Sequence, residues 1–336
     1  MKILVTGGTG LLGRNVILKL QEKGHRIVLL LRNPHKFNIK DEKIRIVKGD
    51  VLEISDIEKA IEGCDAVIHA AADTVQNHRS TDDYKVNTLG TKNILNACKK
   101  NNIQKVVHVG SAGYFGYGTL ENPGEENNPI RYPSNKSFYL LSKLHAQKLV
   151  QDYSRSGHIV TISPTFMIGS LDFGPSSGKI ILMGLKKFIF CPPGGKNFVH
   201  VEDVATACIN AIDYGKSGEN YIIGNENLSY YNFFQKVKEG SKKKSLIIPV
   251  PSFIFYLAGT FGNIIRFFGS KTDISLSNMK ILMINNFFTN QKSIKDLRIN
   301  YQPIEKAIKD AIRFFENENY FFLKSKISII IANLDK

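Results

Sequence analysis

Cysteine is scarce in this sequence, and its few copies lie far apart. The cysteines are Cys64, Cys98, Cys191 and Cys208, and no two of them have the short spacing of a metal knuckle or of a redox-active dithiol. The sequence therefore predicts no metal site and no redox dithiol. We expect all four thiols to be reduced and buried.

The sequence also lacks a signal peptide and a full-length membrane span. It enters a strand-like run at residues 2–6 without the basic, apolar and small-residue regions of a secretory signal, so we expect a cytoplasmic protein. The apolar stretch 252–269 carries one charged side chain and is slightly short for a span. It predicts either a helix packed over a substrate pocket or a patch that contacts a membrane surface. A second apolar run, 327–331, has no functional interpretation.

Basic residues outnumber acidic ones without forming a block. The formal net charge is +15, and Lys242–Lys244 is the nearest approach to a basic tract. Because the basic residues are spread along the chain, the sequence predicts no nucleic-acid partner and only a positive field that favours anionic cofactors and substrates. An apolar content of 43% and a charged content of 22% are those of an ordinary globular protein.

Short β-branched runs alternate with amphipathic stretches in the first half of the chain. We expect strands at 2–6, 26–31, 44–48, 66–69, 105–109 and 158–163, and helices at about 11–23, 56–62, 81–101 and 134–156. This alternation predicts an α/β fold with a Rossmann-type, doubly wound parallel sheet. Gly and Pro clusters then interrupt the pattern. We therefore expect an NAD(P)-binding domain at 1–170, a smaller, mostly helical substrate-binding part at 171–318, and a tail of unknown role at 319–336.

A glycine-rich turn follows the first expected strand and leads into a helix. It contains the spacing Gly7-x-x-Gly10-x-x-Gly13. Glycines permit a tight turn and close backbone approach, while the helix N-terminus offers free amides and a positive dipole end to a pyrophosphate. The position between strand and helix makes the signal specific. The residues predicted to contact a dinucleotide here are Gly7, Thr9, Gly10, Leu11, Leu12 and Gly13.

The end of the second expected strand bears on the choice between NAD and NADP. NAD-preferring enzymes usually place an acidic side chain there for the ribose hydroxyls, whereas this chain has Arg32. A guanidinium pairs well with a 2′-phosphate, and Arg14, just after the third glycine, could assist. We therefore predict NADP as the cofactor, with NAD as the alternative, because an arginine at a strand end is often only a solvated surface residue.

Two further segments suit a cofactor groove. Asp50 and Val51 follow the third expected strand, and Ala70, Ala71 and Ala72 follow the fourth. Asp50 could accept a hydrogen bond from the adenine amino group, and the small alanines allow close approach of the backbone. Asp50 could equally be a turn or capping residue.

The most informative residues are Ser111, beyond the fifth expected strand, and Tyr139 and Lys143, within a long helix. Residues four apart share a helix face, so Tyr139 and Lys143 can point into one cleft. A phenol with a pKa near ~10 is a poor base at neutral pH. We expect the Lys143 ammonium to lower the pKa of Tyr139 and make it a general acid or base. Ser111 would hydrogen-bond the substrate oxygen.

Taken together, these motifs, with Asn87 and the segment 198–204 (Phe-Val-His-Val-Glu-Asp-Val), resemble the extended short-chain dehydrogenase/reductases. That group includes the NAD-dependent epimerase/dehydratase family. The resemblance covers roughly residues 1–318. It implies a catalytic triad of Ser111, Tyr139 and Lys143. Tyr139 and Lys143 would also contact the cofactor, with Lys143 holding the nicotinamide ribose. It further implies that Asn87 supports proton relay, or else forms a structural contact, and that Pro164 lies against the cofactor.

Two departures bear on the substrate. Sugar-nucleotide epimerases tend to have Arg and Asn where this chain has Ser163 and Phe166, and often have Arg-Asp where it has Lys196-Asn197. An apolar Phe166 instead suits a ring system or an acyl chain. The sequence thus resembles more closely the dihydroflavonol-reductase-like and 3β-hydroxysteroid-dehydrogenase-like branch.

Three functions remain open at this point. The first is an oxidoreductase that interconverts a ketone and a secondary alcohol on a fairly apolar small molecule. The second is a nucleotide-sugar epimerase or dehydratase, which uses the same catalytic residues without net change of the cofactor. The third is a dinucleotide-sensing protein without catalysis, which the complete set of catalytic residues disfavours. A homodimer is also compatible with the long helices of this fold.

Overall fold

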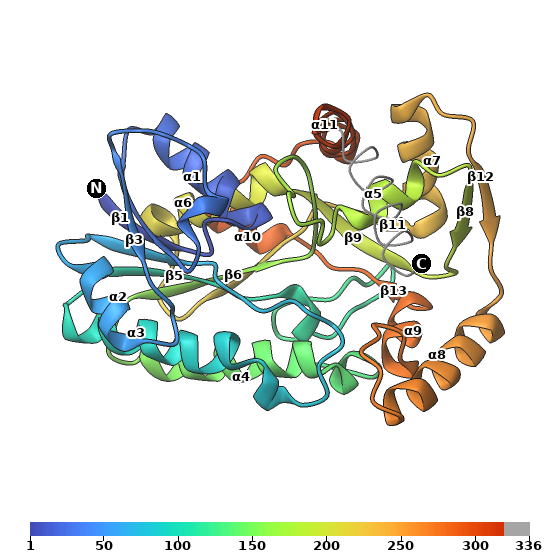
Figure 1. The fold of residues 1–336 in the computed structure, drawn as a ribbon, viewed down its shortest axis with the longest axis horizontal. Helices are drawn as coiled ribbons and strands as arrows, with labels where there is room; N and C mark the ends of the chain where they lie inside the picture. Colours follow the sequence, from blue (N-terminus) through green and yellow to red (C-terminus); the bar gives the residue numbers. More distant parts are fainter. Residues whose placement is uncertain (319–336) are drawn as a thin grey trace, which may run out of the picture.

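Seven parallel strands form the central sheet of the computed structural model, which describes residues 1–318 (Figure 1). Their order is β10-β6-β5-β4-β1-β2-β3, and every neighbouring pair is parallel. The strands are β1 (Lys2–Thr6), β2 (Arg26–Leu31), β3 (Ile44–Lys48), β4 (Ala66–His69), β5 (Lys105–Val109), β6 (Ile159–Pro164) and β10 (Asn220–Ile223). The first strand lies inside the sheet and the chain winds outward on both sides, which confirms the predicted doubly wound Rossmann fold.

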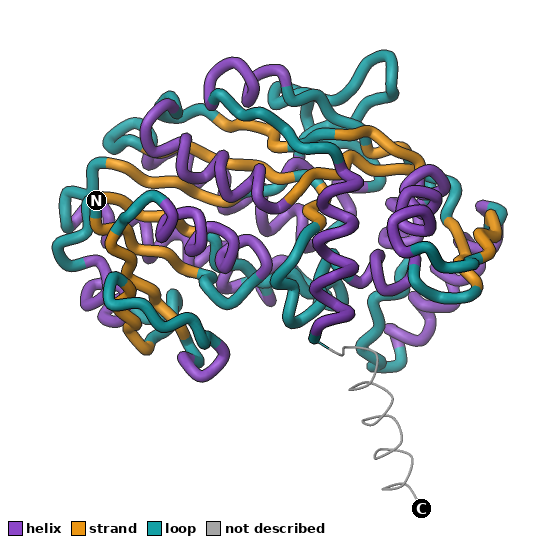
Figure 2. The backbone as a smooth tube through the Cα atoms, turned by 90° about the horizontal axis from the view of Figure 1, so that it is seen from above, coloured by secondary structure: helices purple, strands orange, loops and turns teal. Residues whose placement is uncertain are grey.

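Helices cover both faces of this sheet (Figures 1 and 2). One face packs against α1 (Leu11–Glu22), α6 (Val201–Tyr214) and α10 (Gln291–Leu297), and the other against α2 (Ile54–Ile61), α3 (Thr91–Lys100) and α4 (Phe138–Tyr153). Because the inner strands are buried on both faces, they read as nearly continuous apolar runs in the sequence. That property made their positions predictable.

The expected helix at 81–101 is interrupted. The structure has a 3₁₀ turn at Thr81–Asp83, a π-helical segment at Val86–Gly90, and then α3. The Thr91 hydroxyl donates a hydrogen bond of 2.7 Å to the backbone carbonyl of Asn87. π-Helical segments often occur at functional sites, and this one brings Asn87 towards α4.

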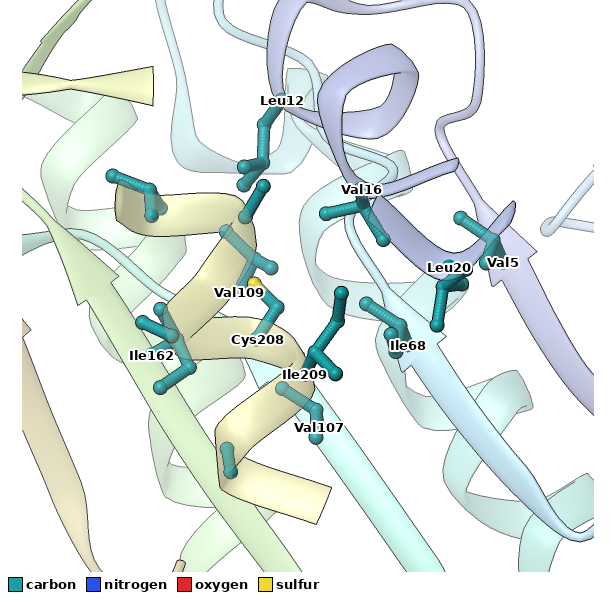
Figure 3. Close-up of a cluster of buried hydrophobic side chains, with 14 of the residues drawn as sticks. Val5, Leu12, Val16, Leu20, Ile68, Val107, Val109, Ile162, Cys208 and Ile209 are labelled. Carbon is teal, nitrogen blue, oxygen red and sulfur yellow. The ribbon is translucent and has the colours of Figure 1, made fainter. Parts of the chain in front are cut away.

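Residues 201–223, from the part predicted to bind the substrate, complete the main sheet. Helix α6 packs against α1, and β10 pairs with β6 at the sheet edge. Figure 3 shows Leu12, Val16 and Leu20 of α1 facing the same cluster as Cys208 and Ile209 of α6. The sequence placed a boundary at residue 170, whereas the structure returns 201–223 to the Rossmann sheet. Both elements are held there by contacts with residues far away in the sequence.

The remaining described residues form a smaller unit of short strands and helices. Its strands are β7 (Phe166–Ile168), β8 (Phe188–Cys191), β9 (Gly195–His200), β11 (Glu226–Ser229), β12 (Leu246–Pro249) and β13 (Asn285–Asn286). Its helices are α5 (Lys179–Gly184), α7 (Tyr230–Ser241), α8 (Ser252–Phe267), α9 (Leu276–Leu282) and α11 (Ile304–Asn317). The unit contains more strand than we expected. Its core centres on the stacked rings of Phe198 and Phe233, 4.1 Å apart.

Two sequence expectations concern burial and membranes. All four cysteines are buried with free thiols, as predicted. Among residues 1–318, no helix is both long enough and apolar enough to cross a bilayer. The tail 319–336 and its apolar run 327–331 lie outside the described residues.

Candidate active site

The glycine loop between β1 and α1 folds as a tight turn against the end of β4. Gly7 has φ +75°, and a Cβ there would lie 2.6 Å from the Ala71 nitrogen. A Cβ on Gly13 would lie only 2.1 Å from the Gly7 carbonyl oxygen. Gly10 differs, because it is exposed and a Cβ there would meet only that same oxygen, at 3.4 Å. Two glycines therefore shape the turn, and the third leaves its outer surface open to a ligand.

The first turn of α1 fits a dinucleotide pyrophosphate. Gly10 is the N-cap residue, and no side chain caps the turn. The first amides of a helix have no partner within the helix, so those of Leu11, Leu12 and Gly13 form an anion-binding end beside the open face of Gly10. Thr9 is half-buried at the tip of the same turn.

The alanines after β4 line the turn from the other side. The Ala71 amide donates a hydrogen bond of 3.2 Å to the Thr6 hydroxyl, and the Ala70 amide donates to the Thr6 carbonyl at 3.3 Å. These bonds hold the backbone of Ala70 and Ala71 against Gly7. Ala72 is half-buried in the same segment. The structure thus brings the glycine loop and the alanines together as the sequence predicted.

The two arginines singled out for NADP differ sharply in environment. Arg32 is exposed at the end of β2, and its side chain forms no hydrogen bond or ion pair with another residue of 1–318. Arg14 is buried. Its guanidinium donates to the carbonyls of Thr9 and Lys36 and lies 4.3 Å from the centre of the Phe173 ring. The Arg14 side chain therefore stabilises the loop, whereas the guanidinium of Arg32 is available to a 2′-phosphate.

Asp50 and Val51 lie at the loop after β3. One carboxylate oxygen of Asp50 accepts a hydrogen bond of 3.0 Å from the Leu52 amide, which is the turn contact that we weighed against a cofactor role. The Val51 side chain is buried, and its carbonyl accepts from Asn93 at 3.1 Å. These bonds fix the loop beside the expected adenine end of the groove.

Ser111 and Tyr139 meet at the carboxyl end of β5. Ser111 begins a 3₁₀ turn and accepts a hydrogen bond of 3.2 Å from the Gly113 amide. Ser137 caps α4 by accepting from the Leu140 amide at 3.4 Å, which places Tyr139 in the first turn. The Ser111 hydroxyl lies close enough to the Tyr139 phenol to lower its pKa. Sequence positions 28 residues apart thus form one polar pair.

The pKa of Tyr139 differs from the sequence expectation. Burial raises it from 10.0 to about 12, and the Ser111 hydroxyl opposes this rise only in part. Lys143 is buried on the same helix, and its ammonium donates a hydrogen bond of 2.7 Å to the Val109 carbonyl. Burial lowers the pKa of Lys143 to about 8. The predicted lowering of the phenol pKa by Lys143 is therefore not seen.

Asn87 is fully engaged by its neighbours. Its amide nitrogen donates to the Asp73 carbonyl at 3.0 Å and to the Ser142 hydroxyl at 2.9 Å, and its amide oxygen accepts from the Asp73 amide at 2.8 Å. These bonds tie the loop after β4 to α4 beside Lys143. These contacts are those of the structural role that we weighed for Asn87, and its support of proton relay stays a prediction.

Two buried histidines lie under Lys143, and sequence reasoning missed them. His69 ends β4 and His108 lies on β5, with ring centres 5.7 Å apart. Burial and the Lys143 ammonium lower the pKa of His69 to about 3 and that of His108 well below 6.5. Neither ring nitrogen of His108 has a hydrogen-bond partner among residues 1–318. The available signal in the sequence was the alternation of side chains along each strand, which places both histidines on the face of the sheet towards α4.

One cavity at the candidate site is formed by elements far apart in the sequence. A cavity of about 180 Å³ lies beside Tyr139, and its other walls come from the loop after β4 and from α8 and α9. Those walls include His78, Tyr84, Asn263, Arg266 and Asn278. Sequence reasoning foresaw a helix near 252–269 over the pocket but named none of these side chains, because no local pattern marks them.

The end of β6 places the residues that distinguished this chain from sugar-nucleotide epimerases. Pro164 is buried in the strand, and Phe166 is half-buried with its ring edge against Phe198, 5.6 Å between centres. The Lys196 ammonium lies 5.5 Å from the centre of the Phe166 ring. Burial lowers the pKa of Lys196 to about 8.

One group of metal-type ligands occurs in the described chain. A nitrogen of His200 and carboxylates of Glu202 and Asp310 lie within 4.8 Å of one another. The Lys306 ammonium lies 3.5 Å from both carboxylates, and His200 contacts Asp310 at 3.1 Å. This arrangement is an ion-pair network that joins α11 to α6, and it carries no argument for a metal.

Comparison with known proteins identifies the family. Residues 3–224 match the NAD dependent epimerase/dehydratase family. The chain belongs to this family. It is 27% identical to a putative dihydroflavonol 4-reductase of Synechocystis sp. over 94% of this chain and 95% of that protein. It is 25% identical to a 3-beta-hydroxysteroid dehydrogenase of Mycolicibacterium neoaurum, over 94% and 91%.

A solved structure agrees with these relatives. The crystal structure of gox2253 superposes with a TM-score of 0.80 at 26% identity and covers 94% of this chain and 98% of its own. The family member described here is thus an enzyme of the extended short-chain dehydrogenase/reductase type, with a nicotinamide dinucleotide as cofactor and a small molecule as substrate. The family and branch resemblance inferred from the sequence is confirmed.

Proposed function

We propose that this enzyme is an NADP-dependent oxidoreductase that interconverts a ketone and a secondary alcohol on a fairly apolar small molecule. The observation that carries the proposal is the placement of Ser111 at the carboxyl end of β5 beside Tyr139 in the first turn of α4, with Lys143 on the same helix. The carboxyl ends of the parallel strands lie at one edge of the sheet, so the glycine loop opens at the same edge.

Tyr139 is the proposed proton carrier. Its raised pKa of about 12 keeps the phenol protonated at neutral pH, which suits proton donation to a carbonyl oxygen during ketone reduction. Ser111 hydrogen-bonds the same oxygen and orients the carbonyl carbon. The bound nicotinamide supplies or accepts the hydride. Lys143 holds the nicotinamide ribose, and Asn87 keeps α4 in register with the loop after β4.

The remaining proposed cofactor contacts follow the groove. The backbone of Gly7, Thr9, Gly10, Leu11, Leu12 and Gly13 surrounds the pyrophosphate, and Asp50 and Val51 flank the adenine. Ala70, Ala71, Ala72 and Pro164 lie along the path to the nicotinamide. Arg32 pairs with the 2′-phosphate, because its guanidinium is exposed at the end of β2, whereas Arg14 is already engaged.

The apolar substrate follows from Phe166 and from the relatives. Phe166 stands half-buried where sugar-nucleotide epimerases tend to have Asn, and the two relatives are named for reactions of a dihydroflavonol and a hydroxysteroid. Lys196 favours the alternative, a nucleotide-sugar epimerase or dehydratase. Its partly buried ammonium has no ion-pair partner among residues 1–318 and could bind a substrate phosphate.

Cofactor titrations provide the first test. NADPH and NADH are titrated against the purified protein, against Arg32→Ala, and against Arg155→Ala as a control, because Arg155 is 82% exposed and remote in sequence from the groove. We expect NADPH to bind at least tenfold more tightly than NADH, and Arg32→Ala to remove most of that difference. Equal binding of NADH would contradict the role of Arg32.

A second measurement separates the two reactions. The reductase predicts net oxidation of NADPH by some member of a panel of apolar ketones. The epimerase predicts tight binding of a uridine, guanosine or thymidine diphosphate sugar in calorimetry, with no net change of cofactor. Lys196→Met should weaken diphosphate-sugar binding only if the second reaction is correct.

A further inference from the structure

We propose that α8 is a docking helix that lies flat on the surface of an anionic lipid bilayer. This 16-residue helix contains one charged side chain, Arg266. Five large apolar side chains of the helix are at least 50% exposed: Phe253, Leu257, Phe261, Ile264 and Phe267. Phe268, directly after the helix, is exposed as well. Such a dense exposed patch on one element is unusual for a surface that faces only water.

The exposed side chains lie on one side of the helix because of their spacing. Phe253, Leu257, Phe261, Ile264 and Phe268 follow one another at intervals of three or four residues, which places them in a stripe. An amphipathic helix with aromatic and aliphatic side chains on one face is the form in which helices bind in the plane of a membrane interface.

The opposite side of α8 is fixed to the protein. A Cβ on Gly262 would lie 2.3 Å from the Ile274 carbonyl oxygen, and one on Gly259 would lie 2.8 Å from the Leu276 Cα. The helix therefore packs through its glycines onto the turn before α9 and the start of α9. Because this contact admits no side chain, α8 cannot rotate its apolar stripe inward without breaking it.

Charge identifies the occupant of this face as a negatively charged surface. The stretch 240–272 contains no Asp or Glu but includes Lys242–Lys244 and Lys271. Strand β12 follows these lysines and pairs with β8. Leu246 of β12 and Phe190 of β8 are both exposed. β8, β12 and α8 occupy the same end of the molecule (Figure 1). Basic side chains thus lie at both ends of the apolar surface formed by β12 and α8, with Lys242–Lys244 before β12 and Lys271 after α8. They complement anionic lipid headgroups, whereas a second copy of a chain with net charge +15 is repelled.

The inner side of the pair formed by α8 and α9 reaches the candidate active site. Arg266 donates a hydrogen bond of 2.8 Å to the His78 carbonyl, and Arg79 donates one of 2.7 Å to the Arg266 carbonyl. Asn263 and Arg266 also line the cavity beside Tyr139. Docking through α8 would place this cavity next to the bilayer. If the substrate is apolar, as the proposed function states, it could then enter directly from the lipid.

Vesicle co-sedimentation tests the docking without substrate or cofactor. The full chain is mixed with vesicles of phosphatidylcholine alone and with vesicles containing 30% phosphatidylserine. We expect strong binding to the anionic vesicles and at least tenfold weaker binding to the neutral ones. The variant Phe261→Glu/Phe267→Glu should lose at least tenfold in affinity. The control Leu120→Glu, which alters a side chain that is 61% exposed elsewhere, should bind as the parent does.

Further variants in the same assay distinguish lipid from other occupants of the α8 surface. Lys242→Gln/Lys244→Gln should weaken binding to anionic vesicles and leave the low affinity for neutral vesicles unchanged. Unchanged binding of Phe261→Glu/Phe267→Glu would overturn the proposal and place the membrane contact elsewhere in the chain. A parent dimer that the same variant dissociates, with no vesicle binding, would identify a second copy as the occupant. Thermal unfolding of each variant verifies folding. Because no cofactor is present, failure here leaves the proposed reaction untouched.

Discussion

The Lys143 ammonium donates a 2.7 Å hydrogen bond to the Val109 carbonyl and thereby lies at the end of β5, below the Ser111–Tyr139 pair. The lysine is 3% exposed, so this single carbonyl replaces most of the water that an ammonium would otherwise bind. The buried positive charge of Lys143 therefore comes at a cost to stability. A ribose hydroxyl would offer that charge a further partner.

The first prediction concerns Lys143→Met and stability. Burial lowers the lysine pKa from 10.5 to about 8, which corresponds to about 3 kcal/mol at about 1.4 kcal/mol per unit. Loss of the hydrogen bond to Val109 offsets about 1 kcal/mol. We expect the free energy of unfolding at pH 7 to rise by about 1–3 kcal/mol in urea titrations, while turnover is lost.

The stability that Lys143→Met gains over the parent should decrease as the pH rises. Below about pH 8 both the folded and the unfolded protein carry the lysine proton, so the full penalty is present. Between about 8 and 10.5 only the unfolded chain keeps the proton, and the stability of the parent rises with pH. The advantage of the Met variant should therefore shrink over this range. A gap that stays constant from pH 7 to 10 would contradict the assignment.

Tyr139→Phe tests proton transfer. Removing the phenol hydroxyl should lower kcat by about 100- to 10,000-fold, the usual contribution of a general acid, because no other group is proposed to carry the proton. Affinity for NADPH should change little in fluorescence titrations. The control Tyr132→Phe removes a hydroxyl from a side chain that is 51% exposed and should retain activity. Full activity of Tyr139→Phe would eliminate the proposed mechanism.

His108→Leu should make the protein more resistant to acid. Burial holds the pKa of His108 well below 6.5, so the unfolded chain alone takes up this proton as the pH falls below about 6.5. The parent then loses up to about 1.4 kcal/mol per pH unit from this group. The Leu variant should unfold at a lower pH, and it should also gain about 1 kcal/mol at pH 7 because two unpartnered nitrogens are removed.

The matched control for this variant is His35→Leu, since His35 is exposed. Acid unfolding followed by circular dichroism should show a shift for His108→Leu and none for His35→Leu. Equal shifts in both variants would mean that the acid sensitivity arises from general charge.

Gly13→Ala tests the shape of the cofactor turn. The new Cβ would lie 2.1 Å from the Gly7 carbonyl oxygen, so the turn must open, at a cost of about 1–3 kcal/mol or more. We expect a lower melting temperature and loss of most NADPH affinity. Gly174→Ala is the control, because a Cβ there meets no atom within 4 Å. Normal NADPH binding by Gly13→Ala would show that the turn can relax without consequence.

The fold was predictable where a local signal reports burial. Strands β1, β2, β4, β5 and β6 are flanked by helices on both faces, and strands buried in this way appear in the sequence as short apolar runs. The break at Val86–Gly90 was not predictable, because it depends on hydrogen bonds from Asn87 to Asp73 and Ser142. The return of α6 and β10 to the sheet likewise depends on partners more than 50 residues away.

The candidate site divides in the same way. The motifs and the order of the strands were enough to predict that Ser111 and Tyr139 lie close together, because the strand ends and helix starts of a Rossmann sheet meet at one edge. The direction of the Lys143 side chain was not encoded locally. It depends on the Val109 carbonyl and on the buried space beside His69 and His108. The pocket residues of α8 and α9 depend on a hairpin held by Arg79 and Arg266.

The late position of α6 in the chain has a consequence for synthesis on the ribosome. The apolar side of α1, including Val16 and Leu20, is covered by α6, which ends at Tyr214. A nascent chain that has released only the first six strands therefore exposes this surface and an unpaired edge at β6. Such an intermediate is a natural client for a chaperone. A fragment that stops at residue 170 should be an aggregating species, and co-expression with residues 171–336 should rescue its solubility.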